Sequence, residues 1–111
     1  MRMWNVDPRM LCRQHLLGEH LEMHMFRGTI VRGRRIDGFV ENGLVETARI
    51  VERHDALARE MRARGMNHKS PMDPFDVEAR GCVDVANSER ELASRCAACR
   101  DRLAGGRHES A

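Results

Sequence analysis

An apolar stripe with the period of an α-helix runs through the first third of the chain. Its members follow one another at spacings of four, seven, three and four residues: Cys12, Leu16, Met23, Phe26 and Ile30. This spacing places them on one face of a helix. Before the stripe, Asp7 suits the N-cap and Pro8 the first helical position. We therefore expect one long helix from about Asp7 to Val31.

Two more helices are expected later in the chain. The second covers about residues 44–64, with Gly65 as its C-terminal stop. The third opens with a capping box, Ser88 and Glu91, and ends before Gly105. The inward face of the second helix is apolar and is formed by Leu44, Ala48, Val51, Ala58 and Met61.

The segments between these helices contain helix breakers. Residues 32–43 hold three arginines and three glycines, which predicts a basic loop with a short helical turn. Residues 67–84 include Pro71 and Pro74 and predict a polar loop. The predicted fold is therefore all-α, a single compact domain of three main helices with long connecting loops. A chain of 111 residues fits one domain, since two would each be too small to hold a core.

The hydropathy pattern argues against a membrane protein. The longest unbroken apolar run has four residues, 96–99, whereas a membrane-spanning helix needs roughly 20. No apolar stretch follows a basic start, so we expect no secretory signal. We expect a cytoplasmic protein, associated with the nucleoid or, if phage-encoded, found in the host cytoplasm. In that compartment the four cysteines are expected as thiols or metal ligands rather than disulfides.

A polar cluster lies along one edge of the first predicted helix. His15, Glu19 and Glu22 fall within about 60° of each other on a helical wheel. Partial burial there would raise the pKa of a glutamate and suit it to proton transfer. The alternative is a polar helix face in solvent, which is common. A zinc-protease site is excluded, because the run from His20 to His24 has its glutamate one position late for H-E-x-x-H.

The C-x-x-C formed by Cys96 and Cys99 has two interpretations. With Leu92 and Leu103 these cysteines form a stripe at helical spacing, which favours packing in the core. The alternative is a structural metal site that also uses Cys82 and a histidine. No second C-x-x-C is present to complete a four-cysteine site.

Primary amines are scarce. Eighteen of the nineteen basic residues are arginines, so Lys69 and the α-amine of Met1 are the two candidates for amine chemistry. Aromatic residues make up only 4%, which argues against a base-stacking platform for nucleic acids. Residues 1–72 have thirteen basic and nine acidic residues, whereas residues 73–111 have six and eight. The first part is therefore compatible with a polyanionic partner.

Three short segments resemble the pyrimidine-dimer DNA glycosylases. They are residues 1–4 (MRMW), residues 14–16 (QHL) followed by Glu22, and residues 64–67 (RGMN). The resemblance covers about residues 1–72, which it marks as a glycosylase-like core. Residues 73–111 form a divergent C-terminal loop and helix.

The resemblance implies a reaction at a damaged nucleotide in double-stranded DNA. In that family the α-amine of the first residue attacks the sugar C1′, displaces the base and forms a Schiff base, and β-elimination then cuts the strand at the abasic site. Transferred to this chain, the nucleophile is the amine of Met1 and the assisting carboxylate is Glu22. The reaction needs no cofactor and no metal. Peptide α-amines titrate near about 7.7–8.0, against about 10.4 for lysine, so more of the amine is neutral at pH 7.

The same resemblance implies the DNA-binding residues. Arg2 and His15 match positions that contact the phosphates or the reacting sugar, and Gln14 lies beside them. The chain departs from the family at Leu21 and Met25, where a family member has arginines. It also lacks an aromatic, basic C-terminal segment. We expect further phosphate contacts from basic and amide side chains of two loops, namely Arg32, Arg34, Arg35, Asn67 and Lys69.

Two other functions remain open at this point. One is a non-catalytic helical DNA-binding protein that keeps the scaffold without the chemistry. The other is a small zinc-stabilised domain built on Cys82, Cys96 and Cys99. We expect a monomer in each case.

Overall fold

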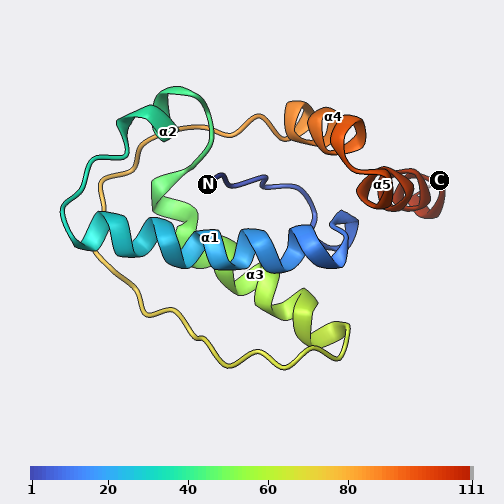
Figure 1. Cartoon of the computed structure of the whole chain (residues 1–111), viewed down its shortest axis with the longest axis horizontal. Coiled ribbons are helices and arrows are strands. Elements are labelled where there is room, and N and C mark those ends of the chain that lie inside the picture. Colours follow the sequence, from blue (N-terminus) through green and yellow to red (C-terminus); the bar gives the residue numbers. More distant parts are fainter. Residues whose placement is uncertain (111) are drawn as a thin grey trace.

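The computed structural model describes the backbone of residues 1–110 and the side chains of residues 1–105. Within this part the chain is all-helical, which confirms the predicted fold class. Two 3-10 turns, η1 and η2, accompany five α-helices (Figure 1). In chain order the elements are η1 (Pro8–Met10), α1 (Arg13–Val31), α2 (Asp37–Glu41), η2 (Thr47–Arg49), α3 (Ile50–Ala63), α4 (Val85–Arg95) and α5 (Ala97–Ser110). None of these helices is long and apolar enough to cross a membrane.

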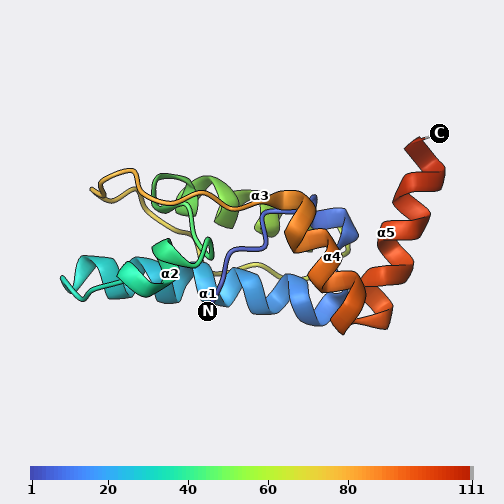
Figure 2. The same cartoon turned by 90° about the horizontal axis from the view of Figure 1, so that it is seen from above.

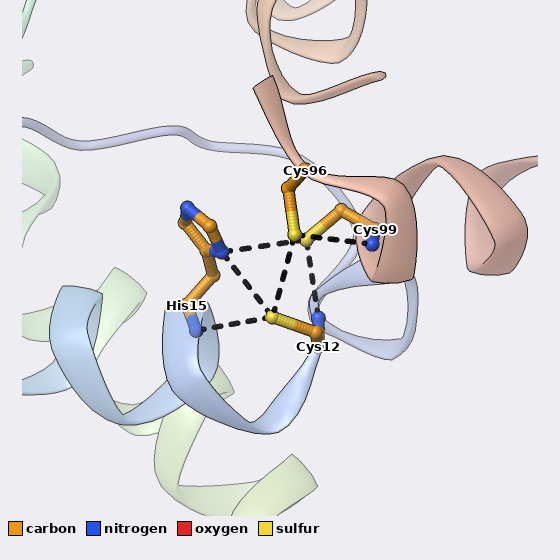
Figure 3. A group of neighbouring side chains, drawn as sticks. All are labelled: Cys12, His15, Cys96 and Cys99. Carbon is orange, nitrogen blue, oxygen red and sulfur yellow. Dashed lines mark hydrogen bonds between the residues drawn. The ribbon is translucent and has the colours of Figure 1, made fainter. Parts of the chain in front are cut away.

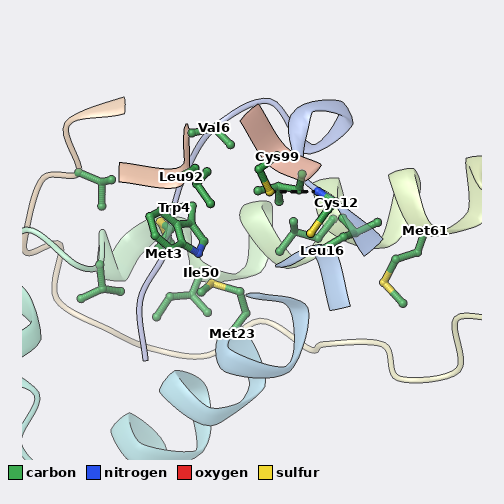
Figure 4. Close-up of a cluster of buried hydrophobic side chains, with 14 of the residues drawn as sticks. Met3, Trp4, Val6, Cys12, Leu16, Met23, Ile50, Met61, Leu92 and Cys99 are labelled. Carbon is green, nitrogen blue, oxygen red and sulfur yellow. Dashed lines mark hydrogen bonds between the residues drawn. The ribbon is translucent and has the colours of Figure 1, made fainter. Parts of the chain in front are cut away.

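The core lies where α1 crosses α3, with the extended N-terminal segment packed over both (Figures 1 and 4). The predicted stripe of α1 faces this core, and its members are buried except for Ile30, which is partly buried. On the second predicted face, Ala48 is exposed and lies outside the core, contrary to expectation. The largest fully buried core side chains include Phe26, Leu16, Met23, Met3, Ile50 and Leu57.

The first predicted helix is interrupted near its start. Asp7 caps η1 through its carboxylate, but Leu11 is extended and Cys12 is the N-cap of α1. The guanidinium of Arg64 explains the interruption, because its Nη2 donates to the Leu11 carbonyl at 2.7 Å and to the Pro8 carbonyl at 3.2 Å. The Leu11 carbonyl is thus satisfied by the side chain of the C-cap residue of α3 instead of by a continuing helix.

The second predicted helix begins later than expected. Residues 44–46 precede η2, and α3 starts at Ile50. This stretch holds the returning loop: the Thr47 N–H donates to the Arg80 carbonyl at 3.0 Å, and Glu46 accepts the Val83 N–H at 2.8 Å. Gly81 has a φ of +88°, and a Cβ there would collide with the Val45 carbonyl. The backbone of the loop before α4 therefore packs closely against residues 44–47, and these residues do not form the first turns of the expected helix.

The third predicted helix differs at both ends. Asp84, rather than Ser88, is the N-cap of α4 and accepts the Asn87 N–H at 3.1 Å. The Ser88 hydroxyl is buried inside the helix, so the predicted capping box is wrong. At Cys96 the backbone becomes extended and α5 turns sharply away from α4 (Figure 2). Contrary to expectation, α5 continues past Gly105 to Ser110.

The long connection between α3 and α4 contains no helix or strand over residues 66–84, as predicted. It passes around the end of α1 before returning beside α2 (Figure 1). Side chains of α1 hold it in place, since His24 Nε2 lies 3.1 Å from the Ser70 carbonyl and Arg27 Nε donates to the Asp73 carbonyl at 3.2 Å. The connection is thus anchored to the core helices along its course.

Candidate active site

A cleft of about 490 Å³ opens beside the N-terminus. Its walls come from the N-terminal segment, the first half of α1, the turn before η2 and the end of α4. The lining residues are Met1, Arg2, Trp4, Gln14, His15, Gly18, Glu19, Glu22, Leu44 and Arg95. Five residues predicted from the sequence as catalytic or DNA-binding are therefore brought together here: Met1, Arg2, Gln14, His15 and Glu22.

The Met1 amine and the Glu22 carboxylate face each other in this cleft. The amine nitrogen lies 3.9 Å from Glu22 Oε1, and the Glu22 side chain is 29% exposed. Burial raises the pKa of Glu22, while the positive amine and the Arg2 backbone N–H partly oppose the rise. A carboxyl group of this kind can gain or lose a proton closer to neutral pH than an ordinary glutamate.

A buried ion pair holds the N-terminal segment against α1. Arg53 of α3 donates to both carboxylate oxygens of Glu19, at 2.6 and 2.8 Å, and to the Val6 carbonyl at 2.6 Å. Glu19 also accepts the Trp4 N–H at 3.1 Å. Because Glu19 is 1% exposed and has three donors, its role is structural, whereas the Glu22 side chain is partly exposed and lines the cleft.

Arg2 is held in the cleft wall by two contacts. Its Nη1 donates to Glu91 of α4 at 2.6 Å, and its guanidinium lies 3.7 Å above the Trp4 ring. Arg2 in turn lowers the pKa of the Glu91 carboxyl. Its buried Nε has no hydrogen-bond partner among the described residues.

His15 connects the cleft to a cluster of cysteines. Its ring meets the Trp4 ring edge-on at a centroid distance of 5.9 Å. Its Nδ1 lies 3.2 Å from Cys12 Sγ and 3.6 Å from Cys99 Sγ (Figure 3). The sulfur of Cys96 completes this group, whereas Cys82 is exposed and belongs to neither metal-capable cluster.

The other predicted DNA-binding residues lie away from this cleft. Arg32, Arg34 and Arg35 follow the far end of α1, about 15 Å along the helix from Glu22 by its rise per residue. Arg34 and Arg35 line a separate cleft of about 360 Å³, where Arg35 pairs with Asp37 at 2.6 Å. Two further residues, Asn67 and Lys69, are exposed on the loop after α3 and do not line the cleft at Met1.

Sequence reasoning missed a cluster of histidines on the opposite side of α1. His20 Nε2 lies 3.1 Å from His54 Nε2 and 2.9 Å from His68 Nε2. Burial and the neighbouring imidazoles lower the pKa of His20 to about 4. Three imidazole nitrogens at this spacing could hold a metal ion. The sequence contains one indication of this cluster, which is the spacing of four residues between His20 and His24. Comparison with the H-E-x-x-H motif does not recognise it.

Comparison with known proteins identifies the family of the chain. A family model described as pyrimidine dimer DNA glycosylase matches residues 1–74. Searches of curated proteins and of solved structures found no significant match. The matched segment contains Met1, Arg2 and Glu22, the groups that meet in the cleft, whereas Cys96 and Cys99 lie outside it. The chain therefore belongs to the pyrimidine dimer DNA glycosylase family, a family of DNA repair.

Proposed function

We propose that this protein is a DNA glycosylase with an associated abasic-site lyase activity, acting on UV-induced pyrimidine dimers. The α-amine of Met1 is the nucleophile and Glu22 handles the protons. The observation that carries the proposal is the 3.9 Å approach of the Met1 amine to Glu22 in a cleft of the family-matched segment.

The reaction begins when the neutral amine attacks C1′ of the damaged nucleotide. The bond from C1′ to the base breaks, and the departing base takes up a proton. The sugar ring then opens as its oxygen is protonated, which leaves C1′ doubly bonded to the Met1 nitrogen as a Schiff base. Loss of a proton from C2′ expels the 3′ phosphate by β-elimination. Glu22 stabilises the developing positive charge and relays these protons, a role that its raised pKa supports.

The DNA contacts divide between the cleft and the loops. Within the cleft, Arg2, Gln14 and His15 bind the phosphates next to the extruded nucleotide. The arginines of the loop after α1 (Arg32, Arg34 and Arg35) and the exposed Asn67 and Lys69 bind phosphates further along the duplex. The partner is double-stranded DNA with a damaged base or an abasic site. We propose that the protein acts as a monomer in the cytoplasm, without a cofactor in the reaction.

The test compares Glu22→Gln with Glu41→Gln, which changes an exposed carboxylate on α2 outside the cleft. Single-turnover cleavage is measured on duplexes with one dimer or one abasic site, and DNA binding is measured by anisotropy at fixed salt. We expect Glu22→Gln to slow cleavage by about 10²–10⁴-fold with binding unchanged, and Glu41→Gln to cleave like the wild type. Wild-type cleavage by Glu22→Gln would contradict the assigned site. A wild-type protein that binds but cuts neither duplex would be a non-catalytic DNA-binding protein.

A further inference from the structure

We propose that Cys12, His15, Cys96 and Cys99 form a structural zinc site that fastens α5 to the start of α1. Their ligand atoms, three sulfurs and one imidazole nitrogen, lie within 4.8 Å of one another (Figure 3). Two of the four residues come from the family-matched segment and two from the segment beyond it.

The distances between the ligand atoms fit a tetrahedral zinc ion. Zn–S bonds of about 2.3 Å and a Zn–N bond of about 2.0–2.1 Å separate two sulfurs by about 3.8 Å, and a sulfur from a nitrogen by about 3.6 Å. In the structure the Sγ atoms of Cys12 and Cys96 are 3.9 Å apart. His15 Nδ1 lies 3.6 Å from Cys99 Sγ and 3.2 Å from Cys12 Sγ. The group therefore needs only small shifts to bind the ion.

Both halves of the site have the same local structure. Cys12 precedes α1 with His15 three residues later, and Cys96 precedes α5 with Cys99 three residues later. Each half is thus a C-x-x-C or C-x-x-H turn at the start of a helix. A second C-x-x-C is absent from the sequence because the half at the start of α1 ends in His15 instead of a cysteine.

Backbone N–H groups point at all three sulfurs. The His15 N–H donates to Cys12 Sγ at 3.4 Å, the Cys99 N–H to Cys96 Sγ at 3.4 Å, and the Cys12 N–H to Cys99 Sγ at 3.3 Å. Such donors stabilise negative charge on sulfur, which is the state that binds a metal. Simple core packing of neutral thiols does not require a donor for each sulfur.

The donor set selects the metal and its role. Thiolates and imidazole in tetrahedral geometry favour Zn²⁺ over the harder Mg²⁺ and Ca²⁺. Four protein ligands leave no open position for a substrate, so the ion is structural. The histidine cluster on the other side of α1 is the competing site, but it offers three imidazoles and no anionic ligand.

The site also orients a side chain of the cleft, a consequence that rests on the proposed function. Zinc on Nδ1 leaves the proton of His15 on Nε2. In Figure 3 this second ring nitrogen points away from the three sulfurs. It becomes a fixed donor on a residue that lines the cleft beside Met1. His15 then acts as a positioning link between the metal and the DNA contacts.

The test begins with metal analysis of untagged full-length protein, prepared with zinc in the medium and under reducing conditions. We expect one zinc per chain, released by chelation with a fall in melting temperature of roughly 10 °C. Replacement by Co²⁺ should produce the intense visible bands and sulfur charge-transfer absorption of a tetrahedral thiolate site. These measurements use the wild-type chain, so they do not depend on whether a variant folds. A folded protein that binds no zinc from a zinc-replete solution would overturn the proposal.

Variants separate the two candidate clusters. Cys96→Ser should lose the zinc and the cobalt spectrum, whereas Cys82→Ser, which changes an exposed cysteine, should keep both. His68→Gln in the histidine cluster should also keep both. Zinc lost in His68→Gln and retained in Cys96→Ser would overturn the proposal. Zinc content is measured without DNA, so failure of the site and failure of the proposed enzyme activity are distinguishable.

Discussion

The segment that matches the family and the segment beyond it contribute to the cleft in different ways. Residues 1–74 supply the amine of Met1 and the carboxylate of Glu22, the two proposed catalytic groups. Residues from 75 onward supply no proposed catalytic group. They form part of the cleft wall at Arg95 and support the proposed DNA-binding residues through the pairing of Glu91 with Arg2 and the contact of Cys99 with His15. The proposed catalytic groups therefore lie in the first segment, and part of the support for the proposed DNA-binding residues comes from the second.

This division has a physical basis in burial. The ion pair of Glu19 and Arg53 lies inside the first segment, is nearly fully buried and fixes the path of the N-terminus. The contact of Arg2 with Glu91 joins the two segments and is partly open to solvent. Loss of the pair of Glu19 and Arg53 should destabilise the fold. Loss of the contact between Arg2 and Glu91 should only change the position of Arg2 in the cleft.

The largest effect is expected from blocking the amine. Acetylation of the Met1 α-amine removes its nucleophilic lone pair, so cleavage of abasic and dimer duplexes should fall to background while DNA binding persists. Lys69→Arg removes the one lysine and provides the control, because it should cleave normally before acetylation and be inactivated by it. Full activity after complete acetylation of Met1 would mean that another group is the nucleophile, and would contradict the role proposed for the first segment.

The next largest effect concerns the buried pair of the first segment. Glu19→Gln leaves the Arg53 guanidinium buried without its counter-charge, and we expect the free energy of unfolding to fall by about 3 kcal/mol. Urea unfolding followed by circular dichroism measures the change. Glu52→Gln on α3, which removes an exposed partner of Arg49 at the end of η2, should leave the midpoint nearly unchanged. Equal effects of the two changes would mean that burial does not decide the role of these pairs.

A smaller effect is expected from acidification of the histidine cluster. The folded-state pKa of His20 is lowered from 6.5 to about 4, so the unfolded chain binds the proton more readily. The free energy of unfolding should therefore decrease as the pH falls from about 6.5 towards 4. Across this range the urea midpoint should change less with pH in His20→Gln than in the wild type. An unchanged slope in the variant would show that His20 does not titrate as its burial predicts.

How much of this could be predicted from the sequence depends on the range of the interactions. The stripe of α1, the basic turn and the long loop follow local patterns, and the structure confirms them. The break before α1 depends on Arg64, more than fifty residues away, which no local pattern reveals. The histidine cluster unites α1, α3 and the following loop, so its members share no spacing. Family resemblance, rather than periodicity, identified Met1 and Glu22 as a pair.

The smallest effect is expected from loss of the contact between Glu91 and Arg2. Glu91→Gln releases Arg2 from its ion pair, and we expect KM for abasic DNA to rise about three- to tenfold with kcat and melting temperature nearly unchanged. Asp101→Asn on α5 removes the same charge from the same segment without touching Arg2, so it should leave KM close to that of the wild type. A similar rise of KM in both variants would mean that the effect does not depend on the contact between Glu91 and Arg2.

Borohydride trapping tests the central claim most directly. Untagged protein is mixed with duplexes that carry an abasic site or a cyclobutane dimer, reduced with borohydride, digested and mapped by mass spectrometry. The account predicts a covalent DNA adduct on the Met1 nitrogen with both duplexes. An adduct on Lys69, or no adduct on either duplex under conditions in which the protein binds them, would contradict it.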